Sequence, residues 1–141
     1  MAQYVGTKVI NAKPMTRQEY NDFRNCQLPP DKNGEDEGYL IEYVDGGKAN
    51  TTAYSGYISW SPKDVFNKTY RPNGNLTFGD AIMLCKAGCR VARAGWNGKG
   101  MWIFLSTAST LPAYLTVQDT LVPWFVSQSD ILAEDWCVLE D

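Results

Sequence analysis

The sequence contains no histidine. Without imidazole, Ser-His-Asp and Cys-His nucleophilic systems are excluded, as are histidine general bases and the usual His-rich catalytic metal sites. An enzyme built from this chain would need carboxylates, lysine, tyrosine or cysteine. Asp130, Glu134 and Asp135 lie close together in the sequence, but no lysine or histidine lies beside them, and Asp130 is placed to cap a helix. We therefore expect no catalytic residues.

Cysteine is scarce and is not arranged in the pairs typical of zinc sites. The four cysteines are Cys26, Cys85, Cys89 and Cys137. A four-thiolate zinc site is conceivable, but Cys85 and Cys89 fall in a helix-to-turn pattern and the other two are isolated. Cys85 and Cys137 lie in apolar runs, so we interpret them as small buried hydrophobic residues in a reducing compartment. We expect no bound metal and no cofactor.

The chain also lacks an excess of positive charge and a long apolar run. Its net charge is −3 and its isoelectric point about 4.9, whereas binding to a nucleic acid backbone requires a basic footprint. The longest uncharged stretch, Gly100–Gln118, is interrupted by Ser, Thr and Pro and is no membrane span. Met1–Lys8 lacks the cationic and apolar regions of a secretory signal. We expect a soluble, cytosolic protein that binds neither nucleic acid nor membranes.

Aromatic residues, in contrast, are plentiful. The chain has five Trp, eight Tyr and five Phe in 141 residues. The flat faces of Trp and Tyr stack on bases or anchor protein interfaces. This composition favours a role in ligand stacking or in oligomerisation.

A turn-forming run, Pro72-Asn73-Gly74-Asn75, divides the chain. Charged side chains are denser before this run than after it. At this length the chain holds one ordinary domain or two very small ones. We predict an α+β protein with two small modules, residues 1–72 and residues 75–141.

In the first module, Thr16–Glu19 has the pattern of a capping box and predicts a helix that stops before the next proline pair. Residues 39–44 and 56–60 are rich in β-branched and aromatic side chains and predict two strands. Ser61 followed by Pro62 predicts the N-cap and the first residue of a second, short helix. The module contains no catalytic motif.

In the second module, Thr77–Asp80 predicts a capped helix with one apolar face, which ends at Gly88. Asn97-Gly98 is the strongest short hairpin signal in the chain and predicts that residues 89–96 pair with residues 99–105. Further strands are predicted at 113–117, 121–126 and 136–139, and Ser127 opens a short turn. We expect the helix to pack on an antiparallel sheet.

A two-residue turn at Asn97-Gly98 would place Ala94 opposite Met101 and Arg93 opposite Trp102. Arg93 and Trp102 would then share one face of the sheet. This pair is either a surface cation–π contact or an aromatic platform beside a guanidinium that binds phosphate. Because such surface pairs are common, we favour the first interpretation.

Three stretches together resemble a known family. They are Leu76–Ala81, Gly88–Trp102 and Pro123–Trp136, and they combine Ala-Arg-x-Gly-Trp-Asn-Gly with a distal Pro-Trp and Asp-Trp. Over residues 75–141 the chain is similar to the second family of Thoeris anti-defence proteins of bacteriophages. Residues 1–72 are similar to a leading module of phage proteins that has no assigned activity.

This resemblance implies a sponge without enzymatic activity. Such a protein forms a homo-oligomer, here a homotetramer, and buries a nucleotide immune signal at its subunit interfaces. The signal would be a cyclic ADP-ribose isomer made by a TIR-domain defence protein in the host cytoplasm, and cyclic oligonucleotides are possible further ligands.

The resemblance, together with the chemistry of nucleotides, points to seven ligand-binding residues. They are Arg93, Trp96, Asn97, Lys99, Trp124, Ser127 and Gln128. Trp96 would stack on the adenine, with Trp124 as the second stacking candidate. Arg93 or Lys99 would pair with the diphosphate, and the three polar residues would donate to ribose or base edges. Because a hairpin tip has few neighbours to bury an indole, we expect Trp96 to be exposed.

Two other classes of function remain open from the sequence. A structural or adaptor protein of a phage particle would also use an aromatic-rich, histidine-free, mildly acidic domain as an assembly interface. A nucleotide hydrolase based on carboxylates is the weaker alternative.

Overall fold

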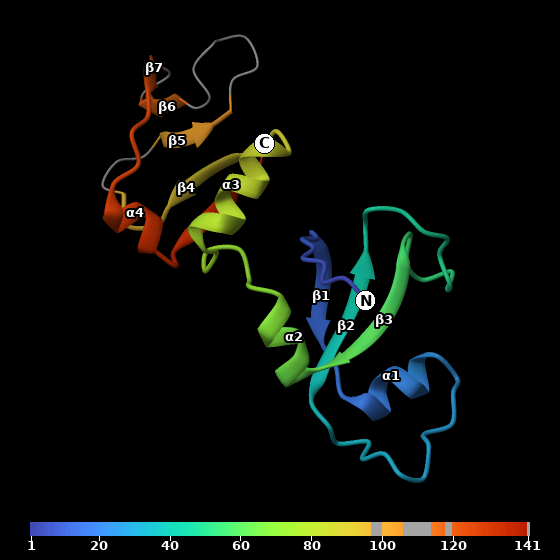
Figure 1. Cartoon of the computed structure of the whole chain (residues 1–141). Coiled ribbons are helices and arrows are strands. Elements are labelled where there is room, and N and C mark those ends of the chain that lie inside the picture. Colours follow the sequence, from blue (N-terminus) through green and yellow to red (C-terminus); the bar gives the residue numbers. More distant parts are fainter. Residues whose placement is uncertain (97–99, 106–113, 118–119, 141) are drawn as a thin grey trace. The chain divides into compact units, whose positions relative to one another are not determined.

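The computed structural model of the chain describes residues 1–96, 100–105, 114–117 and 120–140 (Figure 1). Helices combine with antiparallel sheets, which confirms the predicted α+β class. The chain divides into two compact units, Met1–Tyr70 and Arg71–Asp141. Among the helices in the described ranges, none is long and apolar enough to cross a membrane.

The first unit is built on a three-stranded antiparallel sheet with the order β1-β2-β3. The strands are β1 (Ile10–Pro14), β2 (Gly38–Tyr43) and β3 (Tyr57–Pro62). Leu40 and Ile41 of the central strand and Ile58 of β3 are buried. β1 was not indicated by the sequence, because four of its five residues are exposed and its last residue is proline, as an edge strand allows.

Two short helices, α1 (Arg17–Phe23) and α2 (Lys63–Thr69), complete the first unit. One half of the capping box predicted for α1 is present, since the Thr16 hydroxyl accepts a hydrogen bond from the Glu19 backbone N–H at 3.2 Å. The prediction of Ser61 as the cap of α2 is wrong. Ser61 belongs to β3, where it pairs with Tyr39, and Pro62 is the N-cap with no side-chain hydrogen bond.

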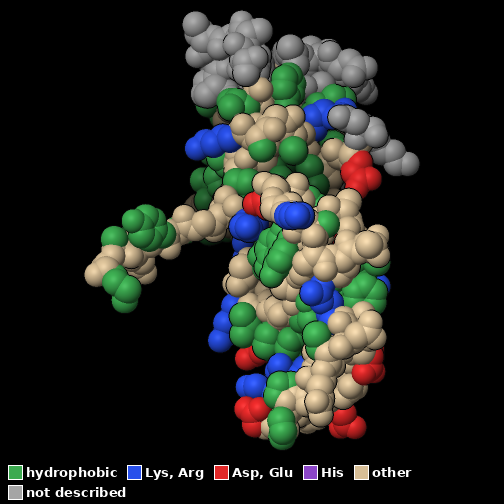
Figure 2. Space-filling model, turned by 90° about the vertical axis from the view of Figure 1, so that its right-hand side faces the viewer, with side chains coloured by type: hydrophobic (Ala, Val, Ile, Leu, Met, Phe, Trp, Pro, Cys, Tyr) green, Lys and Arg blue, Asp and Glu red, His purple; other side chains and the backbone are tan. Residues whose placement is uncertain are grey.

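The residues before β1 are exposed. Tyr4 is 90% exposed and Val5 94%. Four large hydrophobic side chains are exposed before β1, those of Met1, Tyr4, Val5 and Val9. Figure 2 shows hydrophobic side chains at the end of a segment that projects from the rest of the surface. The four exposed side chains contribute nothing to the core of the first unit.

The second unit is a five-stranded antiparallel sheet with the order β7-β6-β5-β4-β8 and two helices. Its elements are α3 (Phe78–Lys86), β4 (Arg90–Arg93), β5 (Met101–Phe104), β6 (Tyr114–Val117), β7 (Thr120–Pro123), α4 (Gln128–Leu132) and β8 (Trp136–Leu139). The long helix α3 lies against β4 and β8 (Figure 1). The last strand therefore returns to pair with the first strand of this unit.

The core of the second unit lies between α3 and the sheet. Its buried residues are Leu76, Ala81, Leu84, Cys85, Val91, Ile103 and Trp136. Cys85 is buried, as predicted, and burial raises the pKa of its thiol to about 11. Cys137, which was also expected to be buried, is only partly so. Trp136 is completely buried and is the largest side chain of this core. The core thus depends on the last strand of the chain.

The register between β4 and β5 differs from the prediction. Val91 pairs with Ile103, whereas a two-residue turn at Asn97-Gly98 would pair Val91 with the next residue, Phe104. Both paired side chains are buried, so core packing sets the register. The predicted pairing of Arg93 with Trp102 is therefore wrong. Instead the guanidinium carbon of Arg90 lies 5.1 Å from the centroid of the Trp102 ring.

Helix α3 begins with the predicted capping box. The Thr77 hydroxyl accepts from the Asp80 backbone N–H at 3.2 Å, and the Asp80 carboxylate accepts from the Thr77 N–H at 3.0 Å. Arg71 also binds this carboxylate through two hydrogen bonds of 2.6 and 2.7 Å. Together these bonds lower the pKa of Asp80 from 3.8 to about 2, and the largest cause is the hydrogen bonding from Arg71. Gly88 ends the helical segment with a φ of 93°, as predicted.

Replacing Asp80 with asparagine is expected to lower the free energy of unfolding by about 1–2 kcal/mol at neutral pH, because the ion pair is lost and the cap is weakened. Since the folded pKa is depressed, this contribution is present above pH 3.8 and disappears as the pH falls toward 2. Urea unfolding of both proteins between pH 7 and pH 2 measures it. The Asp31→Asn variant, which affects a 3.9 Å ion pair, is the control and should not change stability. A difference that persists at pH 2 would contradict the assignment.

Candidate functional site

Arg93, the last residue of β4, is held by two carboxylates from the end of the chain. Its Nη1 donates to Asp130 Oδ1 at 2.7 Å, and its Nε donates to Asp135 Oδ1 at 2.9 Å. The sheet brings these groups together, because Arg93 pairs with Trp136 and Asp135 directly precedes that residue. The side chains are 20%, 13% and 33% exposed for Arg93, Asp130 and Asp135. The three charges form a partly buried network with a net charge of −1.

The network keeps all three groups ionised at neutral pH. The hydrogen bonds that Arg93 donates to Asp135 and then to Asp130 raise the pKa of Arg93, and the bond from Arg93 is the main cause that lowers the pKa of Asp135. Burial acts to raise the pKa of Asp130, but hydrogen bonds from Arg93, Ser127 and Trp96 outweigh it and lower the pKa. Neither aspartate is therefore suited to act as a general acid near neutral pH.

Three tryptophans and one phenylalanine gather beside this network. The ring centroid of Trp136 lies 5.5 Å from that of Trp96 and 6.2 Å from that of Trp124, both in edge-to-face geometry. Phe78 of α3 lies 5.9 Å from Trp136 and 6.3 Å from Trp124. Trp96 and Trp124 are partly buried and pack against the core. The structure thus places both predicted stacking residues around one buried indole.

The expectation that Trp96 is exposed is wrong. Trp96 is partly buried, and its indole Nε1–H donates to Asp130 Oδ1 at 3.4 Å. The neighbours that cover it, Asp130 and Trp136, are more than 30 residues away in the sequence. A hairpin pattern contains no information about them.

The polar candidates are placed as follows. Ser127 caps α4, and its hydroxyl accepts from the backbone N–H of Asp130 at 3.1 Å. Gln128 is the first residue of α4 and is exposed. Asn97 and Lys99 lie outside the described residues. The structure therefore brings Arg93, Trp96 and Ser127 together through Asp130.

Sequence reasoning considered Asp130 and Asp135 as members of an acid/base group and set that role aside, and it expected Asp130 to cap a helix. That cap is wrong, because Ser127 is the N-cap of α4 and Asp130 lies in its first turn. The structure gives the two aspartates a different place, as the partners of Arg93. The charge of Arg93 could have indicated these partners, because a partly buried arginine at the end of a short strand needs a carboxylate nearby.

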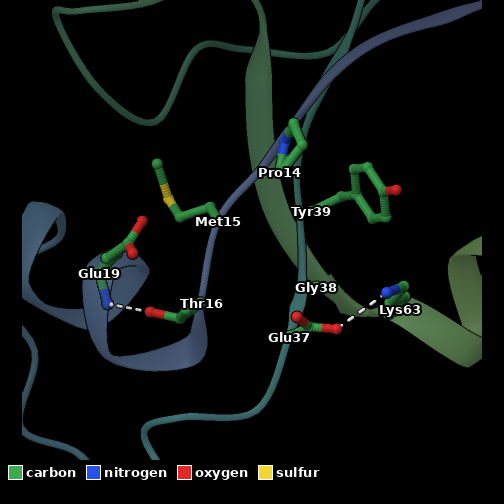
Figure 3. A pocket seen from close by; sticks show the side chains of 8 residues that line it. All are labelled: Pro14, Met15, Thr16, Glu19, Glu37, Gly38, Tyr39 and Lys63. Carbon is green, nitrogen blue, oxygen red and sulfur yellow. Dashed lines mark hydrogen bonds and ion pairs between the residues drawn. The ribbon is translucent and has the colours of Figure 1, made fainter.

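The first unit has a shallow cavity of about 320 Å³. Figure 3 shows the residues that line it, which are Pro14, Met15, Thr16, Glu19, Glu37, Gly38, Tyr39 and Lys63. Lys63 and Glu37 form a 2.9 Å ion pair in this cavity, and both are largely exposed. No predicted ligand-binding residue lies there, so the candidate site remains in the second unit.

The second unit is thus a small α+β domain, with a capped helix on an antiparallel sheet and clustered tryptophans beside an ionic network. Residues 76–139 match the sequence profile of the Thoeris anti-defense 2-like domain. The chain is also similar to Thoeris anti-defense 2 of Bacillus phage SP01. The two are 32% identical over an alignment of length 84, which covers 45% of this chain and 94% of the relative. The chain belongs to the Thoeris anti-defence 2 family, which confirms the predicted resemblance.

Proposed function

We propose that this protein is a phage anti-defence sponge that binds a nucleotide immune signal in the host cytoplasm and holds it without cleavage. The signal is a cyclic ADP-ribose isomer made by TIR-domain proteins, with cyclic oligonucleotides as further possible ligands. The observation that carries the proposal is the family match over residues 76–139, which contain the clustered tryptophans.

A sponge acts by stoichiometry, so it must bind the signal more tightly than the receptor does. Stacking of a base on tryptophan contributes about 1–3 kcal/mol per base, and charged hydrogen bonds to phosphate add to it. Trp96 and Trp124 are the stacking residues, and Asn97, Ser127 and Gln128 the polar donors. Arg93 is shared by two carboxylates, which favours Lys99 as the main partner of the diphosphate.

Retention without cleavage agrees with the chemistry available. The chain has no histidine. Asp130 and Asp135 are ionised, and each carboxylate already accepts a hydrogen bond from Arg93. A carboxylate that acts as a general acid needs a raised pKa, and both of these are lowered.

Heating the complex separates this proposal from its alternatives. The purified protein is mixed with the cyclic ADP-ribose isomer, freed of unbound ligand and denatured by heat, and the released small molecule is identified by mass spectrometry. Release of the intact molecule is expected. An altered product would indicate an enzyme, and no retained molecule would favour a structural or adaptor protein of a phage particle.

We also propose a homotetramer with ligands at subunit interfaces. Large hydrophobic side chains are exposed in the segment from Phe125 to Leu132 of the second unit: Phe125 is 88% exposed and Leu132 72%. Apolar surface of this kind is typical of protein interfaces. A second copy that covers it would remove these side chains from water.

Light scattering is expected to give about four times the chain mass of 15.8 kDa. The Phe125→Glu and Leu132→Glu variants should dissociate the assembly, because a charge in an apolar interface is costly. Val65→Glu, at a 50% exposed position of the first unit, is the matched control and should leave the mass unchanged. A wild-type monomer at micromolar concentration would contradict the interface.

The second domain is proposed to be sufficient for ligand binding. The structural unit begins at Arg71, slightly before the predicted start at residue 75. Asn73 belongs to this unit, because its side-chain amide exchanges hydrogen bonds with Val138 at 2.7 and 3.1 Å.

A fragment of residues 71–141 is expected to fold and to bind the nucleotide with nearly the affinity of the whole chain. Circular dichroism checks its folding and titration calorimetry its binding. A folded fragment that no longer binds would show that residues 1–70 contribute to the site.

A further inference from the structure

Asp130 is the junction between the ionic network and the tryptophan cluster. Its backbone N–H donates to the Ser127 hydroxyl at 3.1 Å, and its backbone carbonyl accepts from Trp136 Nε1 at 3.0 Å. Its carboxylate oxygen Oδ1 accepts from both Arg93 and Trp96. The side chain is only 13% exposed. The position of this carboxylate is therefore set from several sides.

The carboxylate and the core together restrict the Trp96 ring. The ring packs edge-to-face with Trp136 at an interplanar angle of 75°. Its Nε1–H, at the edge of the indole, points to Asp130. Packing restricts the tilt of the ring, and the hydrogen bond restricts its rotation in its own plane. A side chain that is already ordered loses less conformational entropy when a ligand binds to it.

The hydrogen bond at 3.4 Å is long and is weak by itself. The Arg93 guanidinium, at 2.7 Å from the same oxygen, holds the carboxylate in place. Arg93 thus acts on Trp96 through Asp130.

We propose that Asp130 is a positioning residue for ligand binding, which orients the Trp96 indole for stacking on the base. This inference rests on the proposed function. Asp130 acts through Trp96 and does not contact the ligand, so its effect on affinity should depend on the indole N–H.

A double-mutant cycle in the full-length chain tests this role. The affinity for the cyclic ADP-ribose isomer made by a TIR-domain enzyme is measured for Asp130→Ala alone and together with Trp96→Phe, which keeps an aromatic ring but lacks the N–H. Asp130→Ala is expected to weaken binding about tenfold in the wild type and less than about twofold in the Phe variant, because contacting residues couple. Asp130→Asn, which retains an oxygen acceptor, should restore most of the affinity.

Two further measurements separate positioning from folding. The indole N–H resonance of Trp96, identified as the signal missing from Trp96→Phe, should shift upfield in Asp130→Ala, because its acceptor is gone. The control Arg71→Gln removes the ion pair with Asp80 in the same unit and should change neither the resonance nor the affinity.

Equal weakening by Asp130→Ala in both backgrounds, an unchanged affinity, or an unmoved Trp96 resonance would each overturn the positioning role while leaving the proposed function intact. A wild-type chain that retains no nucleotide would instead overturn the proposed function and the inference that rests on it.

Discussion

Replacing Trp136 with alanine is expected to lower the free energy of unfolding of the second unit by about 3–5 kcal/mol, the usual cost of deleting a buried tryptophan. The side chain is completely buried, and three aromatic rings lie within 6.2 Å of its centroid. Its loss also leaves the Asp130 carbonyl without the indole donor. Because small domains are stable by only about 5–15 kcal/mol, this would be a large fraction of the unit's stability.

The loss should be confined to the second unit. The buried core residues of the first unit, Leu40, Ile41 and Ile58, belong to a separate sheet. In urea, followed by circular dichroism and by NMR, the Trp136→Ala chain should show one weakened and one unchanged transition. Ile58→Ala is the reciprocal control and should weaken the other transition. A change below about 1 kcal/mol in the second unit would contradict the central place of Trp136.

Local patterns predicted the elements whose stabilisation is local. The helix α3 has its capping box at Thr77 and its left-handed glycine at Gly88, both within a few residues of the turns they stabilise. The strand β8 has the predicted bounds, because its apolar run is short and clearly delimited. These features need no knowledge of the rest of the chain.

Features that depend on distant partners were not predictable in the same way. β1 is a strand because it pairs with β2, although its own residues are mostly polar or exposed. The register of β4 and β5 is set by burial of Val91 against Ile103, not by the turn sequence. The missed strand β1 and the wrong β4–β5 register have the same cause. Sequence patterns report local preferences, whereas tertiary packing decides which strands pair and in which register.

The candidate site shows the same division. Trp96 was identified from its motif, whereas its burial required Trp136 and Asp130, which come from β8 and α4. The partners of Arg93 were also misassigned, since the strand pairing that brings Asp135 beside it was not known. The sequence thus indicated which residues belong to the candidate site, but not which neighbours surround them.

Replacing Trp96 with alanine is expected to weaken binding of the cyclic nucleotide by about 1–3 kcal/mol, roughly fivefold to more than a hundredfold. This is the size of one base stacked on one aromatic ring. Since Trp96 also packs against Trp136, the variant should lose about 1–2 kcal/mol of stability as well. The loss in affinity must therefore be separated from the loss in stability.

Ile103→Val provides the matched control. Ile103 is 1% exposed and lies in the same core, so this substitution should cost about 0.5–1.5 kcal/mol of stability without removing a stacking surface. Titration calorimetry on both variants, at a temperature where thermal melts show each to be folded, should find weakened binding for Trp96→Ala and wild-type affinity for Ile103→Val. Weakening in both would attribute the effect to destabilisation.

The result for Trp96 also decides between the two stacking candidates. Trp124 makes the other edge-to-face contact with Trp136. Among the described residues its indole makes no hydrogen bond to a carboxylate, whereas the Trp96 indole N–H donates to Asp130. An indole fixed in this way is the better ordered of the two before binding, and it should give the larger loss when removed. If Trp96→Ala binds with unchanged affinity while Trp124→Ala does not, Trp124 is the stacking residue and Trp96 serves the core.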